Sequence, residues 1–202
     1  WPRCFIIDPH DRNPHALLWI AIDDTNEAWS YREAYLPEHT IEDVVEHIRK
    51  VEIDSKEKVQ LRIIDPNFGP KRYANSGNTV RDEFEQAGRK LNYPVRFSFG
   101  DDSSKEVARK VVSQMLKYDP LKPLGLLNHP SLHVASDLKD CIYQIEHYIW
   151  DDFRLSDRDP KEKPKDLNTH FPDILQYFAM SGFRGMKPQI HEGVGNFYTS
   201  RN

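Results

Sequence analysis

Two short stretches of the chain share the pattern Ile-Ile-Asp-Pro, at residues 6–9 and 63–66. In each, an apolar β-branched run is typical of a buried strand and leads straight into an aspartate, and the following proline cannot continue the hydrogen-bond ladder of a sheet. Asp8 and Asp65 are therefore predicted to lie at the C-terminal ends of two strands. Ligands gather at this edge of an open α/β sheet, so the two carboxylates are expected to converge on one pocket. A single Asp-Pro pair is a common turn, and it is the repetition that favours a functional set.

A third carboxylate, Asp173, directly follows Pro172. Because proline is tolerated only in the first turn of a helix, Asp173 is expected about one turn into a helix, where the partial positive charge of the helix start favours an ionised carboxylate. Carboxylate oxygens suit Mg²⁺ and Mn²⁺, and two such ions about 3.5 to 4 Å apart can activate a water and stabilise a leaving oxygen together. The hypothesis is that Asp8, Asp65 and Asp173 hold two divalent ions in a site that cleaves phosphodiesters.

The surrounding pattern predicts one mixed α/β sheet flanked by helices. Strands are expected at residues 3–7, 16–22, 28–35, 59–64, 94–99 and 132–134. Helices are expected after the cap Thr40, with Asp43 completing a capping box, and at residues 79–89, 103–118, 137–150 and 169–181. The path from an antiparallel hairpin, turning at residues 23–26, through a helix to the strand at 59–64 predicts a parallel crossover.

Two details of the helices can be checked directly. The inward face of the helix at 103–118 is expected to carry Val107, Val111, Val112, Met115 and Leu116. The helix at 169–181 is expected to end at Gly182.

The bulk composition fits one domain over residues 1–202, with a core at about 3–182 and a loosely held tail at 187–202. The chain is 38% hydrophobic with a mean hydropathy of -0.73, and no stretch approaches the roughly 18 to 20 apolar residues of a membrane span. No membrane partner is therefore predicted. The net charge of -4 argues against binding nucleic acid by overall charge, so a polyanion would need a local basic patch or bound cations.

The two cysteines, Cys4 and Cys141, have no CxxC motif or Cys/His cluster. They are expected to be buried, reduced thiols, which indicates a reducing compartment. The chain begins without an initiator Met and leads directly into a strand, so we expect a piece of a longer protein.

The order and spacing of several motifs resemble the C-terminal nuclease domain of tailed-bacteriophage large terminase subunits. The motifs are CFIIDPH at 4–10, PHALLW at 14–19, IIDP at 63–66, YIW at 148–150 and HFPDILQY at 170–177. The resemblance covers residues 3–181 and implies a ribonuclease H-like fold and an Mg²⁺- or Mn²⁺-dependent endonuclease that cuts concatemeric double-stranded viral DNA. It places the family's metal-binding acids on Asp8, Asp65 and Asp173. It further implies an upstream ATPase domain, portal and small-subunit partners, and the cytoplasm of an infected bacterium.

Two departures from the family pattern stand out. Members often carry Asp-His before the final motif, whereas this chain has Thr169-His170, so a fourth acid is missing and the role of His170 stays open. No GxxxxGK[ST] phosphate loop occurs, so an ATPase would lie outside this chain. Asp11 is a minor candidate for the metal site because of its closeness to Asp8. His10 and His15 are interpreted as surface or hairpin residues, since hard ions rarely need imidazole.

Candidate phosphate contacts are basic residues in loops or at helix starts, each of which could equally be an ordinary solvated charge. They are Arg12, Lys71, Arg72 and Lys105, with Lys161, Lys163 and Lys165 in a late linker at 157–166. Two other hypotheses stay open. One is a different ribonuclease H-like nuclease, such as a junction resolvase or an integrase core, and the other is a catalytically silent docking module.

Overall fold

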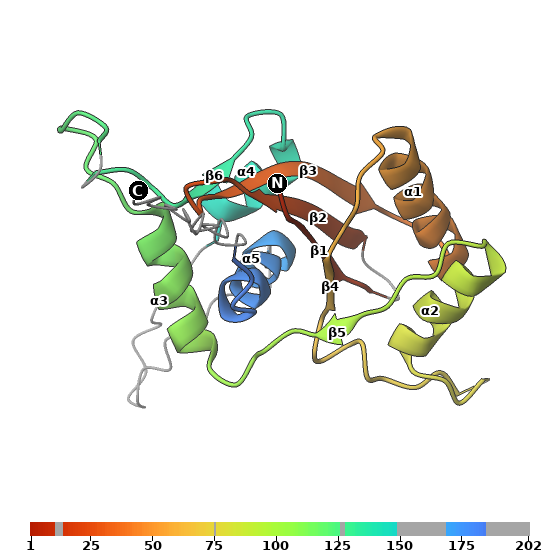
Figure 1. Ribbon diagram of the computed structural model, residues 1–202. Helices are drawn as coiled ribbons and strands as arrows, with labels where there is room; N and C mark the ends of the chain where they lie inside the picture. The colour runs from red at the N-terminus through yellow and green to blue at the C-terminus, as the bar shows by residue number, and fades with distance from the viewer. Residues whose placement is uncertain (11–13, 75, 126–127, 149–168, 185–202) are drawn as a thin grey trace, which may run out of the picture.

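A six-stranded mixed sheet forms the centre of the protein (Figure 1). The computed structural model describes residues 1–10, 14–74, 76–125, 128–148 and 169–184. The strands are β1 (Arg3–Asp8), β2 (His15–Ile22), β3 (Ala28–Leu36), β4 (Leu61–Ile64), β5 (Ser98–Phe99) and β6 (Leu132–Val134). Their order is β5-β4-β1-β2-β3-β6. β1, β2 and β3 are antiparallel to one another in turn, β4 is parallel to β1, β5 to β4, and β6 to β3. The predicted mixed sheet with a parallel crossover is confirmed.

Helices cover both faces of this sheet (Figure 1). α1 (Ile41–Asp54) and α2 (Val80–Lys90) pack on one face. α5 (His170–Met180) packs on the other, next to α3 (Lys105–Leu116) and α4 (Lys139–Glu146). Within the described ranges, none of these helices has the length and apolar character to cross a bilayer.

Alternation along β1 divides the apolar core into two halves. Cys4 and Ile6 face α5, whereas Phe5 and Ile7 face α1 and α2, because successive strand residues point to opposite sides of a sheet. Every residue of β2 is buried. The central strands therefore read as continuous apolar runs, and β1 ends at Asp8 with both of its faces covered.

Both cysteine thiols are buried and unpaired, as predicted. Cys4 lies in β1, and burial raises the pKa of its thiol. Cys141 lies in α4, where burial, aided by the nearby Glu33 carboxylate, raises the pKa to about 12. Neither group is a thiolate at neutral pH, so both act as small apolar side chains.

Local signals in the sequence determine several element ends. Thr40 and Asp43 form the predicted capping box at the start of α1. The carboxylate of Asp23 accepts hydrogen bonds from the backbone N–H groups of Thr25 and Glu27 at 2.9 Å, and Asn26 adopts a φ of 67° in the turn between β2 and β3. Gly182 follows α5 with a φ of +67°, the left-handed conformation expected at a helix end.

The expected inward face of α3 is wrong at Val107, and Val111 is half-buried and not among the residues packed against the core. Val107 is 48% exposed, and the buried residue of this helix is Ala108. Val112, Met115 and Leu116 pack against the core as predicted. α3 touches the molecule through α5 and β6, so its apolar contact is a narrower stripe than the run of valines suggested.

The strand expected at 94–99 is shorter than predicted. Pro94 has no N–H to donate to a ladder, and only Ser98 and Phe99 pair with β4. The helix expected at 137–150 is described as Lys139–Glu146. Residues 149–150, the linker at 157–166 and the tail at 187–202 lie outside the described residues.

Candidate metal centre

The two strand-end aspartates lie on neighbouring parallel strands. Ile7 pairs with Ile64 in the register of β1 and β4, and the backbone N–H of Asp65 donates to the carbonyl of Ile7 at 3.0 Å. Asp8 and Asp65 therefore leave the sheet side by side at the same edge. Each is 7% exposed, so both carboxyl groups are largely removed from water.

Asp65 is held by hydrogen bonds to both of its carboxylate oxygens. Oδ1 accepts from the backbone N–H groups of Asn67 at 2.6 Å and Phe68 at 2.5 Å, the local turn that aspartate favours after a strand. Oδ2 accepts from the hydroxyl of Tyr177 at 2.5 Å. The turn is set by local sequence, but the hydroxyl comes from α5, 112 residues away.

α5 brings the third carboxylate to this edge. Its first turn contains Pro172 and Asp173, and the backbone N–H of Phe171 donates to Oε1 of Gln144 in α4 at 3.0 Å. Thr169 supplies no side-chain cap, so a distant glutamine satisfies one of the orphan donors at the helix start. Positions 170, 173 and 177 follow helical spacing and share one face.

That face of α5 meets all of the acidic groups. Nδ1 of His170 lies 2.7 Å from Oδ2 of Asp8, and Tyr177 bonds to Asp65. Oδ1 of Asp173 accepts from Nε2 of Gln176 at 3.0 Å. One helix therefore orients three carboxylates whose positions in the chain are far apart.

The electrostatics of the site show that these carboxylates act on one another. Burial raises the pKa of Asp8, the hydrogen bond from His170 acts against it, and the charge of Asp65 adds to it. Burial likewise raises the pKa of Asp173, to about 6, with the ammonium of Lys105 acting against this and the charges of Asp8 and Asp65 adding to it. A divalent cation would relieve both the burial cost and the repulsion.

The remaining two side chains on this face are tuned by the same acids. Burial alone would lower the pKa of His170, but the hydrogen bond and charge of Asp8 outweigh it and the pKa is raised. Burial and the charge of Asp65 raise the pKa of Tyr177, so its hydroxyl remains a donor at neutral pH.

Two histidines stand closer to Asp8 than sequence reasoning suggested. Ligand atoms of Asp8, His10 and His170 lie within 4.8 Å of one another, and this is the one such group of three among the residues that the structure describes. Asp65 and Asp173 lie outside this tight group. His10 lies in the connection of the β1–β2 hairpin, as predicted, and is half-buried; its ring stacks on Phe68 at 5.5 Å and meets His170 edge-on at 5.2 Å. The signals in the sequence were the spacing of His10 two residues after Asp8 and of His170 three before Asp173.

His15 begins β2 in the β1–β2 hairpin, as predicted, and it is buried. It is 6% exposed, its Nδ1 accepts from the backbone N–H of His10 at 3.3 Å, and its Nε2 lies 3.1 Å from the carbonyl of His39. Burial lowers the pKa of His15. The residue therefore supports the backbone of His10 and does not itself join the acidic group.

The donor set fits hard divalent ions. Three buried or half-buried carboxylates could supply oxygen ligands, which Mg²⁺ and Mn²⁺ prefer. Imidazole ligands, as at His170 and His10, are more typical of Zn²⁺, Cu²⁺, Fe²⁺ and Ni²⁺ than of Mg²⁺ or Mn²⁺. Asp8 belongs to both possible ligand groups: the close group with His10 and His170, and the pair of strand-end aspartates with Asp65.

The basic candidates are distributed unevenly around this site. Nζ of Lys105 lies 4.0 Å from Oδ2 of Asp173, and Nζ of Lys71 lies 4.6 Å from the centroid of Phe68, the ring that stacks on His10. Arg72 donates to the carbonyl of Gly77 at 2.6 Å and so supports its own loop. Asp11, the minor candidate for the metal site, lies outside the described residues. So do the other predicted phosphate contacts: Arg12, Lys161, Lys163 and Lys165.

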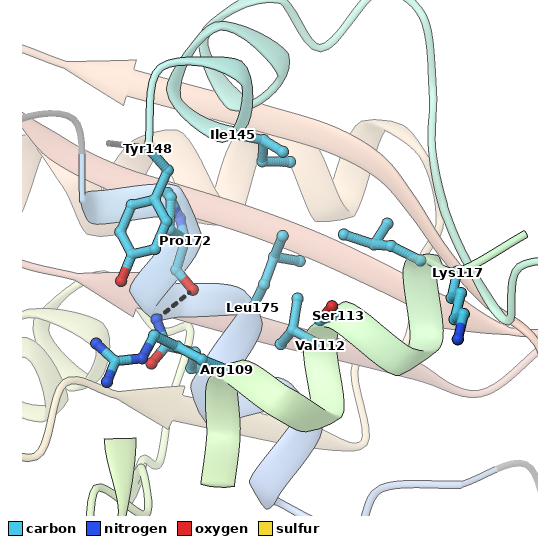
Figure 2. Close-up of a pocket in the computed structure, with 10 residues that line it drawn as sticks. Arg109, Val112, Ser113, Lys117, Ile145, Tyr148, Pro172 and Leu175 are labelled. Atoms are coloured by element: carbon cyan, nitrogen blue, oxygen red, sulfur yellow. Dashed lines mark hydrogen bonds between the residues drawn. The ribbon is translucent and has the colours of Figure 1, made fainter. Parts of the chain in front are cut away.

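A separate groove of about 420 Å³ adjoins the site between α3, α4 and α5 (Figure 2). Ile145 and Leu175 lie along it, with Tyr148 and Pro172 near one another and Lys117 further away (Figure 2). None of the described residues that line it is Asp, Glu or His. This groove therefore offers no carboxylate or imidazole ligand from the described residues.

A mixed sheet of this order with helices on both faces is the ribonuclease H-like nuclease fold, and this chain has the form found in large terminases. A large terminase from a thermophilic bacteriophage matches over 91% of this chain, with a TM-score of 0.65 and 16% identity. The P22 large terminase nuclease domain matches over 95% of this chain and 87% of its own, with a TM-score of 0.62 and 14% identity.

The large terminase nuclease domain of bacteriophage SPP1, solved with bound Mn, matches over 88% of this chain and 84% of its own, with a TM-score of 0.53 and 13% identity. This chain spans 40% of the length of the large terminase from the thermophilic bacteriophage. No protein-family model and no curated protein matches the sequence. The predicted resemblance to a terminase nuclease domain is confirmed at the level of the fold.

Proposed function

We propose that this chain is the metal-dependent endonuclease domain of a viral DNA-packaging terminase, which hydrolyses phosphodiester bonds of concatemeric double-stranded DNA. The observation that carries the proposal is the meeting of Asp8, Asp65 and the first turn of α5 at one sheet edge, where burial raises the pKa of Asp8 and of Asp173 and the charge of Asp65 adds to both. The SPP1 nuclease domain of the same fold, solved with bound Mn, supports it.

In this proposal Asp8, Asp65 and Asp173 are the metal ligands and hold two Mg²⁺ or Mn²⁺ ions. Bound divalent ions would supply a Lewis acid for the phosphate and lower the pKa of the attacking water. The protein's own part is to orient the carboxylates and shield them from bulk water. His170 fixes the orientation of Asp8 through their hydrogen bond, and His10 is close enough to complete the ligand set.

DNA binding in this proposal depends on a few local cations. Lys105, which lies beside Asp173, and Lys71, which stands over Phe68, are the described residues best placed to contact phosphates near the metal ligands. Arg72 and Arg12 remain candidates, and Arg12 lies outside the described residues. Because the net charge is -4, we expect the domain to bind DNA without metal only at micromolar or weaker affinity on the non-specific scale.

The wider setting follows from the same proposal. A translocating ATPase domain would precede this chain in the full-length protein, as the match to 40% of the thermophilic bacteriophage's large terminase suggests. A portal and a small terminase subunit would be its further partners. The site of action would be the cytoplasm of the infected bacterium.

The test is cleavage of plasmid DNA with Mn²⁺, with and without EDTA. We expect cleavage by the unmodified chain, its loss in EDTA, and its loss in Asp8→Asn and Asp65→Asn. Asp24→Asn, a change at an exposed turn residue, is the matched control and should cut normally. Cleavage at the unmodified rate by the two site variants would refute the proposal.

Two outcomes would redirect the assignment. Cleavage confined to branched junctions, or strand joining, would indicate a resolvase or integrase core. Absence of any binding heat with millimolar Mn²⁺ in calorimetry would indicate a docking module that keeps the sheet without the metals.

A further inference from the structure

The hydroxyl of Tyr177 makes a hydrogen bond to Asp65 that has no role in the proposed hydrolysis as described so far. It donates to Oδ2 of Asp65 at 2.5 Å, and the side chain is 2% exposed. A carboxylate has about four lone-pair positions, two on each oxygen. Two backbone N–H groups take those of Oδ1, and the Tyr177 hydroxyl takes one of Oδ2. Among the described residues, one acceptor position of Asp65 therefore remains, and it is on Oδ2.

The ring of Tyr177 is held in place by the backbone beside it. A Cβ at Gly100 would lie 2.9 Å from Cγ of Tyr177 and 3.0 Å from Cδ1, which leaves no room for a side chain at position 100. The N–H of Gly100 in turn donates to the carbonyl of Ile64 at 2.9 Å. The ring therefore rests on a segment anchored to β4, the strand that ends at Asp65.

These contacts close a short loop of interactions. β4 positions Asp65 through the chain, β4 also positions Gly100 through a hydrogen bond, and Gly100 positions the ring whose hydroxyl returns to Asp65. A shift of the ring towards Gly100 would press it against the backbone there. Such an arrangement sets the direction of a carboxylate oxygen more firmly than a water or a long flexible side chain could.

We propose that Tyr177 is a positioning residue that aims the free acceptor position of Asp65 Oδ2 at the metal, so that Asp65 binds through this single oxygen. This inference rests on the proposed function, because it takes Asp65 to be a metal ligand. Partners of ligating carboxylates commonly change metal affinity or activity by about 10- to 100-fold when removed. The role of Tyr177 is to orient Asp65, and it does not itself touch substrate or ion.

The experiment compares Mn²⁺ binding, by calorimetry on the chain without DNA, in Tyr177→Phe and Tyr31→Phe. Tyr31 is a matched control because its hydroxyl also donates to a carboxylate, Oε2 of Glu57 at 2.8 Å. Tyr177→Phe keeps the ring and removes the hydroxyl. We expect its Mn²⁺ affinity to be lower than that of the unmodified chain by about 10-fold or more. Tyr31→Phe should bind Mn²⁺ like the unmodified chain. In cleavage, Tyr177→Phe should need more Mn²⁺ for half-maximal rate, and saturating Mn²⁺ should restore most of the rate.

The outcomes separate this inference from the proposed function. Unchanged Mn²⁺ affinity in folded Tyr177→Phe, with Asp65→Asn still abolishing binding, would overturn the positioning role and leave the metal site standing. Unchanged affinity in Asp65→Asn would overturn the site itself, and the positioning role with it. If Tyr177→Phe does not fold, Gly100→Ala takes its place, because it retains the hydroxyl but displaces the ring. Unmodified Mn²⁺ affinity in Gly100→Ala would then refute the inference.

Discussion

Replacing Glu52, a residue of α1 whose side chain is not one of the candidate metal ligands, with glutamine should destabilise the fold strongly. Glu52 is 1% exposed. Its carboxylate accepts from Nε1 of Trp19 at 3.1 Å, from Nη2 of Arg62 at 2.5 Å and from the hydroxyl of Tyr93. The change to glutamine keeps the size of the side chain, removes the charge, and turns an NH₂ group towards donors that need an acceptor.

The magnitude follows from the burial of both partners. Arg62 has a side-chain exposure of 14%, so loss of the charge on Glu52 leaves a nearly buried guanidinium without its anion. Breaking a buried ion pair in this way costs about 3 to 5 kcal/mol, and the residual exposure of Arg62 favours the lower end. For a chain of this size, about 3 kcal/mol corresponds to a decrease of about 6 to 12 °C in the melting temperature.

The assay is urea unfolding of the single variants Glu52→Gln and Arg62→Met and of the double variant. The double variant should be more stable than the sum of the two losses predicts, because it leaves no unpaired charge. Glu46→Gln is the control on the same helix, where the pair with Arg49 is exposed and the loss should be much smaller. If Glu52→Gln destabilised the protein no more than Glu46→Gln, the reasoning from burial would be refuted.

The remaining predictions concern pH and the start of α5. Burial acts to raise the pKa of Glu57, but the hydrogen bonds from Arg32 and Tyr31 outweigh it and hold the pKa below its ordinary value of 4.5. The stability that the ionised Glu57 contributes should therefore be fully present above pH 4.5 and decrease as the pH falls through the lower, folded-state pKa. Glu57→Gln should make the decrease of stability in acid unfolding less steep, and an unchanged slope would contradict this prediction. Gln144→Ala should cost about 1 to 3 kcal/mol in urea unfolding, because the buried N–H of Phe171 loses its acceptor; a loss near zero would show that α5 starts equally well without this cap.

Local chemistry explains why so many elements could be predicted from the sequence. Some features depend only on contacts within a few residues, so a short stretch of sequence is enough to predict them. They are the capping box at Thr40, the turn at Asp23 and the two Asp-Pro strand ends. Val107 shows the limit of such windows. Helical spacing identifies an apolar face, but how much of it is covered depends on which neighbour packs there, and the main neighbours of α3 among the described residues are α5 and β6.

The sequence by itself determined that Asp8 and Asp65 end strands and that Asp173 begins a helix, because β-branched runs, prolines and helix-start preferences act locally. Only the tertiary structure decided that His170 meets Asp8 across 162 residues and that Tyr177 meets Asp65 across 112. These contacts have no signature in either partner's neighbourhood. They exist because the packing of α5 against β1 brings its start and its third turn to the edge where β1 and β4 end.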